Sequence, residues 1–136
     1  MLLIESPHNE RFKKLLKLST DNKFRRKSKL FIIEGLKEIR AALEHNYELE
    51  EVYIDDKYKT AFPEKEFDQV SVTILKHDLF SRLVYREDAS YILAVLKEPV
   101  LDLSQIQLPE NPLIIILENI EKPGNLGALL RTCDAV

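Results

Sequence analysis

The sequence predicts an α/β protein: a small three-layer α/β/α domain, followed by the first strand and helix of a second α/β domain. Helical and strand-like periodicities alternate through the first 98 residues. Prolines and polar residues then dominate residues 99–112, which is typical of a linker. An uninterrupted aliphatic run, Leu113–Leu117, opens the last part of the chain. The predicted boundaries are therefore 1–98 for the first domain, 99–112 for the linker and 113–136 for the start of the second domain.

The first predicted helix begins at Ser6-Pro7. A serine N-cap followed by proline favours a helix start, because the N–H that proline lacks would have no intrahelical partner there. Apolar residues recur at helical spacing until Thr20-Asp21-Asn22 ends the helix, and the basic residues 23–29 are expected to form a loop. The β-branched run Leu30–Ile33 predicts a strand that stops at Glu34-Gly35, where the glycine serves a strand-to-helix turn.

A second amphipathic helix follows this turn. Its apolar face carries Leu36, Ile39 and Leu43, and Asn46 is expected to be a left-handed C-cap. Asp78 is expected to cap a short third helix. The remaining apolar runs predict three further strands, at Leu49–Ile54, Val70–Leu75 and Tyr91–Leu96. Because helices alternate with strands, the sheet is expected to be mostly parallel or mixed and covered by helices.

The C-terminal segment looks like the opening of another sheet. Five aliphatic residues without alternation, Leu113–Leu117, predict a strand that is buried on both faces. Gly124 and Gly127 lie where this strand would turn into a helix, and glycine there permits positive φ and close backbone approach. The free N–H groups of such a helix start favour an anion or a sugar–phosphate. One strand and one helix cannot bury such a strand, so we expect the sequence to belong to a longer protein.

The net charge of −3 conceals a strong asymmetry. Residues 11–29 hold nine basic side chains and one acid, a net charge of +8, whereas the rest of the chain carries −11. A basic segment on an acidic protein indicates a site for an anion, of which the phosphate backbone of a nucleic acid is the commonest. On charge alone, a helix and loop kept soluble by lysines explains the pattern equally well.

Several function classes are disfavoured by composition. No apolar run approaches the roughly 18 to 20 residues that a membrane-spanning helix needs, and the first residues do not resemble a secretory signal. The single cysteine, Cys133, suits a reducing cytoplasm and is expected to be a buried, unreactive thiol. The three histidines are far apart, so we interpret them as surface or helix-end residues and expect no metal site.

The segment Pro123-Gly124-Asn125-Leu126-Gly127, followed by Arg131-Thr132 and Ala135, resembles the first signature motif of the SpoU (TrmH-like) family of RNA ribose 2′-O-methyltransferases. Further matches fall in the substrate-binding domain that precedes the catalytic domain in many members: Asn9, Arg11, Lys14, Leu15, Leu18, the basic segment, Phe31–Gly35 and Tyr91–Val95. The chain departs from the family at Lys122, where members often have aspartate, and it ends before the second and third motifs.

The resemblance implies a knotted SPOUT-type catalytic domain that binds S-adenosylmethionine near its C-terminus and works as a homodimer. This chain would then hold no cofactor site and no complete dimer interface. Arg131 matches the residue favoured as catalytic at the ribose 2′-hydroxyl, and Asn125 matches an asparagine that helps to shape that site. Arg131 would act as a base or as an electrostatic stabiliser; the second role fits a guanidinium better, because it stays protonated.

The leading hypothesis is therefore an RNA-recruiting fragment of a cytoplasmic methyltransferase that acts on ribosomal or transfer RNA. The residues expected to bind RNA are Arg11, Lys14, Lys23, Arg25, Arg26, Lys27, Lys29 and Glu34. Two alternatives remain open: a non-catalytic RNA-binding module resembling a ribosomal protein, and a nucleotide-binding domain built on the glycine turn. The last of these leaves the basic segment unexplained.

Overall fold

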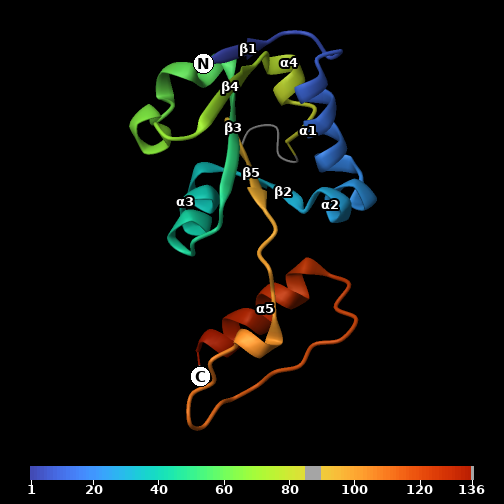
Figure 1. Cartoon of the computed structure of the whole chain (residues 1–136), viewed down its shortest axis with the longest axis vertical. Helices are drawn as coiled ribbons and strands as arrows, with labels where there is room; N and C mark the ends of the chain where they lie inside the picture. Colours follow the sequence, from blue (N-terminus) through green and yellow to red (C-terminus); the bar gives the residue numbers. More distant parts are fainter. Residues whose placement is uncertain (85–89, 136) are drawn as a thin grey trace. The chain divides into compact units, whose positions relative to one another are not determined.

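The computed structural model describes residues 1–84 and 90–135. The chain divides into two compact units, Met1–Val100 and Leu101–Val136 (Figure 1). The described helices include none that is long and apolar enough to cross a membrane.

A five-stranded mixed sheet forms the centre of the N-terminal unit (Figure 1). Its strands are β1 (Leu2–Ile4), β2 (Leu30–Glu34), β3 (Leu49–Asp55), β4 (Ser71–Leu75) and β5 (Ile92–Lys97). They lie in the order β1-β4-β3-β5-β2. The pairs β1–β4 and β3–β4 are parallel, whereas β3–β5 and β2–β5 are antiparallel. The predicted mixed sheet is confirmed, and β2 lies at one edge of it.

Helices cover both faces of this sheet. The helices of one face are α1 (Glu10–Thr20), α2 (Asn22–Ser28) and α4 (His77–Phe80); the other face carries α3 (Leu36–Glu44) and the 3₁₀ turns η1 (Asp56–Ala61) and η2 (Glu64–Phe67). The side chains of β3 alternate between two apolar clusters, so Tyr53 packs toward α1 while Val52 and Ile54 pack toward α3. The predicted three-layer α/β/α architecture is confirmed.

The first helix, α1, starts later than predicted. Ser6 and Pro7 precede α1 in a turn that is closed by the Asn9 N–H donating to the Ser6 carbonyl, at 3.2 Å. The N-cap is Asn9, whose side chain accepts from the Arg11 N–H at 2.9 Å. The predicted start at Ser6-Pro7 is wrong because a second capping residue lies closer to the first buried side chain, Phe12.

The predicted loop at residues 23–29 is also wrong, because α2 occupies most of it. The Asp21 carboxylate caps α2 by accepting from the N–H groups of Lys23 and Phe24, at 2.8 and 3.1 Å. The helix ends at Lys29, which adopts the left-handed conformation at φ 55°. α2 shows no apolar periodicity because only Phe24 packs against the core.

The remaining turns are a mixture of confirmed and corrected predictions. Gly35 joins β2 to α3 at φ 103°, as the sequence indicated. Asn46 is left-handed at φ 61°, as predicted, but the C-cap residue of α3 is His45, one position earlier. Asp78 does not cap α4; it lies within that helix, and Lys76 is the N-cap residue. β1 was not predicted, because a strand of three residues with a single buried side chain has no readable pattern.

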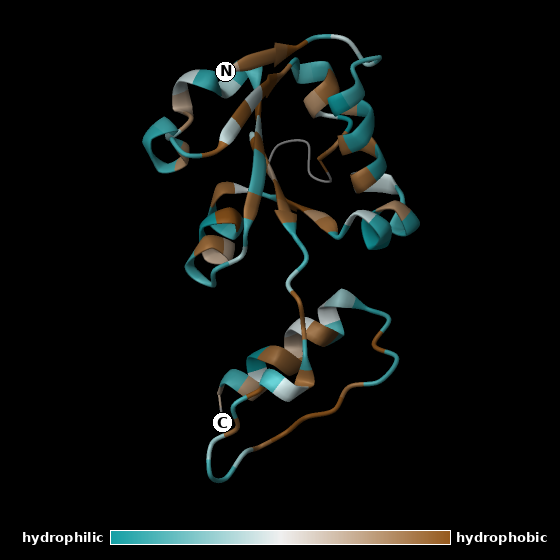
Figure 2. Ribbon diagram, in the orientation of Figure 1, coloured by the Kyte–Doolittle hydropathy of each residue, from teal (hydrophilic) through white to brown (hydrophobic). Residues whose placement is uncertain are grey.

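The C-terminal unit contains the 3₁₀ turn η3 (Leu103–Gln105) and the helix α5 (Pro123–Asp134). The predicted buried strand Leu113–Leu117 is wrong for this structure: the segment has no regular secondary structure and pairs with no described strand, and Ile116 is 89 % exposed. Figure 2 shows it as a hydrophobic stretch of irregular chain. A strand buried on both faces needs neighbouring strands that form hydrogen bonds with its backbone N–H and C=O groups. The described part of this unit holds no such strand.

Candidate nucleic-acid interface

The basic segment of the sequence lies on two consecutive helices, α1 and α2. α1 packs Phe12, Leu15 and Leu18 against the sheet, which turns Lys14 and its other charged side chains to solvent. Arg11 lies near the buried Tyr53, whose hydroxyl donates to the Glu51 carboxylate. Burial and that carboxylate raise the pKa of the Tyr53 hydroxyl, and the charge of Arg11 opposes the shift. α1 thus presents cations outward while its apolar side anchors it.

α2 extends the cationic surface. Lys23, Arg26 and Lys27 are exposed on this short helix. Lys29, at its C-cap, forms an ion pair of 3.1 Å with Glu98, so part of its charge is already compensated. Most of the cations that the sequence predicted to bind RNA therefore lie on one pair of adjoining helices, and the described contacts leave Lys23, Arg26 and Lys27 directed to solvent.

Arg25 differs from its neighbours because its side chain turns inward. Its Nη1 donates to the backbone carbonyls of Leu18, at 2.6 Å, and Ser19, at 3.0 Å, and its Nη2 donates to the side chain of Asn22. These carbonyls belong to the last turn of α1, where the helix dipole favours a cation. Arg25 therefore joins α2 to α1, a structural role that its place in a basic run does not reveal.

A surface hollow of about 310 Å³ lies beside Arg25. α1 and α2 supply Leu18, Ser19 and Arg25, the edge strand β2 supplies Phe31, Ile32 and Glu34, and Leu83 and Leu93 complete the lining. Of the residues predicted to bind RNA, the hollow brings together Arg25 and Glu34. Ser19, Leu83 and Leu93 were missed, because three distant segments meet there and no local pattern marks them.

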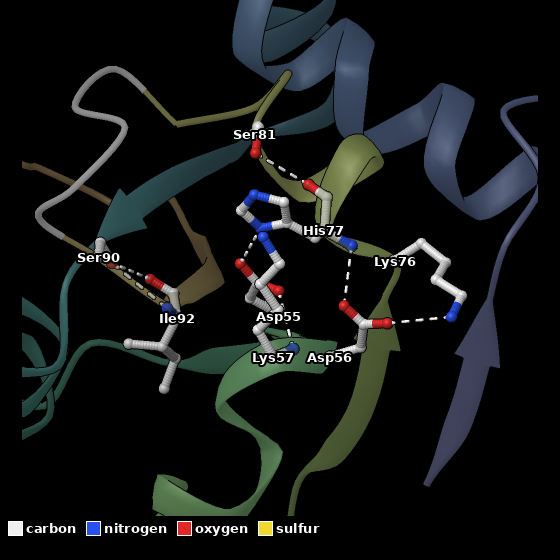
Figure 3. A network of polar contacts seen from close by, with 8 residues as sticks. All are labelled: Asp55, Asp56, Lys57, Lys76, His77, Ser81, Ser90 and Ile92. Atoms are coloured by element: carbon white, nitrogen blue, oxygen red, sulfur yellow. Dashed lines mark hydrogen bonds and ion pairs between the residues drawn. The ribbon is translucent and has the colours of Figure 1, made fainter.

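A second polar cluster lies at the carboxyl ends of the parallel strands β3 and β4 (Figure 3). The buried Asp55 carboxylate contacts His77 Nδ1 at 2.7 Å and accepts from the Lys57 N–H at 3.0 Å. Asp56 accepts from the His77 N–H at 3.0 Å and pairs with Lys76 at 3.2 Å. These contacts tie the end of β3 to the start of α4.

This second cluster is poorly suited to phosphate. Burial alone would raise the pKa of the Asp56 carboxyl, but Lys76 and the His77 N–H together hold that pKa below its usual value. Asp56, and to a smaller extent Glu5, raise the pKa of the Lys76 ammonium. Asp56 and Glu5 therefore place negative charge beside Lys76. Within residues 1–84 and 90–135, no group of three potential metal-ligating side chains is placed to hold a metal ion.

The two residues predicted to be catalytic lie on α5. Pro123 occupies the first turn of this helix, Lys122 is its N-cap residue, and Asn125 lies inside the helix rather than capping it. Gly124 and Gly127 are also helical, and the left-handed residue that precedes α5 is Asn119, at φ 55°. The expected role of these two glycines at positive φ is wrong because the turn comes earlier in the chain.

Arg131 lies six residues after Asn125, on the same exposed helix. Its Nη1 would lie 3.7 Å from a Cβ atom placed on Gly127, so the guanidinium runs back along α5. The half-buried Cys133 follows in the last turn. Asn125 and Arg131 share one helix, and the ion pairs of the described residues include none with Arg131.

Residues 9–94 match the family described as the MRM3-like substrate binding domain. The chain belongs to this family. The matched segment contains α1, α2, the hollow, the strands β2, β3 and β4 and the first half of β5, whereas β1 and α5 lie outside it.

Named relatives of this MRM3-like domain are RNA methyltransferases. The 23S rRNA (guanosine(2553)-2′-O)-methyltransferase RlmP of Bacillus subtilis (strain 168) is 30 % identical over 99 % of this chain and 51 % of its own length. The crystal structure of an RNA 2′-O ribose methyltransferase, also 30 % identical, matches with a TM-score of 0.75 over 98 % of this chain and 52 % of that one. The SpoU methyltransferase AviRb from Streptomyces viridochromogenes shares the fold, at 24 % identity and a TM-score of 0.79 over 94 % of this chain and 50 % of its own. The chain spans about half the length of the curated relatives it matches.

Proposed function

We propose that this chain is the RNA-recruiting part of an S-adenosylmethionine-dependent RNA 2′-O-methyltransferase of the SpoU family, together with the first motif of its catalytic domain. The observation that carries the proposal is the concentration of exposed cations on α1 and α2 in a protein of net charge −3. A phosphate backbone is the ligand that such a surface attracts most strongly. The named relatives favour ribosomal RNA over transfer RNA as the substrate.

The N-terminal unit is proposed to hold RNA by phosphates and shape. Lys14, Lys23, Arg26 and Lys27 are long, exposed cations that contact phosphate oxygens without reading bases. Folded RNA presents its phosphates and 2′-hydroxyls in a geometry that such a surface can recognise. Binding of this kind weakens steeply as salt rises, because each neutralised phosphate releases counterions. A ribosomal RNA substrate and a single free thiol both favour the cytoplasm.

The methyl donor is proposed to bind in the part of the relatives' length that this chain does not span. S-adenosylmethionine needs a concave, largely apolar pocket, whereas the aliphatic side chains of the C-terminal unit are exposed, Leu113 by 75 % and Ile116 by 89 %. These exposed side chains support the proposal that this unit alone does not hold the cofactor. We expect the chain alone to be inactive, and the homodimer to form through the rest of the catalytic domain.

Arg131 is proposed to act on the substrate at the ribose. Methyl transfer would form a bond from the 2′-oxygen to the methyl carbon as the donor's sulfur–methyl bond breaks and leaves a neutral thioether. The hydroxyl proton would pass to a base or to water, so negative charge would develop on that oxygen. A guanidinium stays protonated in proteins, and it can stabilise the developing charge while it holds an adjacent phosphate. Asn125, one and a half to two turns earlier on α5, is proposed to help shape the same site.

The decisive experiment compares methyl transfer by this chain with transfer by a protein that contains it together with a complete catalytic domain. Labelled S-adenosylmethionine and total RNA are the substrates, and the label is located after nuclease digestion. Label on ribose from the longer protein alone is the expected result. No label from either protein, with salt-sensitive RNA binding intact, would instead identify a non-catalytic RNA-binding module.

A further inference from the structure

The hollow between α1, α2 and the edge strand β2 has the composition of a ligand site. Its walls include Leu18, Leu83 and Leu93, and its polar groups are Ser19, Arg25 and Glu34. Natural ligand sites combine apolar walls with a few polar groups, and their volumes begin at about 300 Å³. The hollow, at about 310 Å³, lies at the small end of that range. It suits a flat ring system of the size of a nucleobase better than a larger ligand.

We infer that this hollow receives one unpaired nucleobase of the bound RNA, and that guanine fits it best. This inference rests on the proposed function, since the phosphates on either side of the base would lie on α1 and α2. Proteins recognise RNA sequence mainly at unpaired bases, which can be splayed out of a loop and bound through their edges. A hollow beside a cationic helix pair places a base site and a phosphate site next to each other.

Glu34 is the group that selects guanine. Guanine presents two adjacent N–H donors on its Watson–Crick edge, from N1 and from the 2-amino group, and a carboxylate can accept both. The other three bases offer a carboxylate no such pair. Glu34 takes part in a further interaction within the protein, but a carboxylate has about four lone-pair sites, so it can accept more than one partner.

Arg25 and Ser19 complement the remaining polar atoms of the base. The contacts of Arg25 with Leu18, Ser19 and Asn22 account for three of the five N–H donors of a guanidinium. The others can serve base acceptors such as O6 and N7 of guanine. The Ser19 hydroxyl donates to the Leu16 carbonyl at 2.9 Å, and its oxygen keeps the capacity to accept. Because backbone carbonyls hold Arg25 in place, the polar side of the hollow is organised before RNA arrives.

The test measures binding of the full chain to labelled hairpin RNAs that share one stem and differ at one loop position, which carries guanine, adenine, uridine or an abasic residue. The wild-type protein is expected to bind the guanine loop roughly tenfold more tightly than the abasic one, as one bidentate base contact allows. Ser19→Phe fills the hollow without altering charge, and Glu34→Gln keeps the size of the side chain while removing the paired acceptors. Both variants should lose the guanine preference while the salt dependence stays unchanged.

The outcomes separate this inference from the function on which it rests. Salt-sensitive binding without base preference in the wild-type protein would overturn the base site and leave RNA recruitment standing. A guanine preference that survives in Glu34→Gln would also overturn it, since the base would then be read elsewhere. Thermal unfolding checks that both variants fold, and if Ser19→Phe does not, Glu34→Gln alone decides. Absence of salt-sensitive RNA binding by the wild-type protein would refute the proposed function itself.

Discussion

Arg25 and Arg26 are neighbours in the sequence, but replacing each by alanine should change a different property. Arg25→Ala should lower the stability of the fold, and Arg26→Ala should weaken RNA binding. Arg25 donates to the carbonyls of Leu18 and Ser19 at the end of α1, whereas Arg26 is exposed. Hydrogen bonds from a charged donor contribute about 1.5–3 kcal/mol each when buried. Arg25 is half-buried and water can replace part of what is lost, so we expect Arg25→Ala to lower the free energy of unfolding by about 1–2 kcal/mol in total.

Thermal unfolding followed by circular dichroism measures this loss. A destabilisation of 1 kcal/mol shifts the Tm of a domain of this size by about 4–8 °C, so Arg25→Ala should unfold roughly 4–16 °C below the wild-type protein. Arg26→Ala is the matched control, because an exposed substitution changes stability by less than about 0.5 kcal/mol. In RNA binding, Arg26→Ala should reduce the slope of log K against log salt by about 0.7–0.9, the contribution of one phosphate contact.

One pattern of results would refute this reasoning. If Arg25→Ala melted at the wild-type temperature and reduced the salt slope as much as Arg26→Ala, Arg25 would be a surface phosphate contact. Its bonds to the α1 carbonyls would then contribute nothing to stability. The inference that these bonds organise the polar side of the hollow before RNA binds would be refuted as well.

Three further predictions concern other parts of the chain. Gly35→Ala should cost about 1–3 kcal/mol in unfolding free energy, because φ 103° is strained for any residue with a side chain; an unchanged Tm would contradict this. Asp56→Asn should lower the Tm at neutral pH. Because the folded-state pKa of Asp56 lies below its usual 3.8, its stabilising pairing with Lys76 is present above that value and is lost as pH falls through the lowered pKa. The Tm difference between variant and wild type should therefore shrink toward zero in acid, and a pH-independent difference would show that the charge is irrelevant. In the longer protein, Arg131→Ala should abolish most methyl transfer and spare RNA affinity, and unchanged turnover would remove Arg131 from the mechanism.

The elements that the sequence predicted well are those with a clear pattern of apolar residues. α3 buries helically spaced side chains against the sheet, and β3 and β5 are short apolar runs whose side chains enter both core clusters. Gly35 and Asn46 were predictable for a related reason, because few residue types tolerate positive φ. α2 was missed because it buries little, although Asp21 was a readable capping signal.

The candidate RNA surface was only partly visible in the sequence. Charge segregation located the cations of residues 11–29 without structural information. It could not distinguish Arg25, which turns inward to the end of α1, from Arg26, which remains exposed. It also could not reveal the hollow, whose lining includes Leu83 and Leu93 from segments far along the chain.

The sequence by itself determined the α/β class, the strand-to-helix turn at Gly35, the basic segment and the motif around Asn125 and Arg131. Each of these depends on the chemistry of residues close together in the chain. Only the tertiary structure decided that β1 joins the sheet, that Arg25 and Glu34 share one hollow, and that Leu113–Leu117 forms no strand with the described residues. The physical reason is that a local pattern shows only which side of a segment avoids water. A strand also needs a neighbouring strand for its backbone hydrogen bonds, and a pocket needs walls from several segments that are distant in the chain.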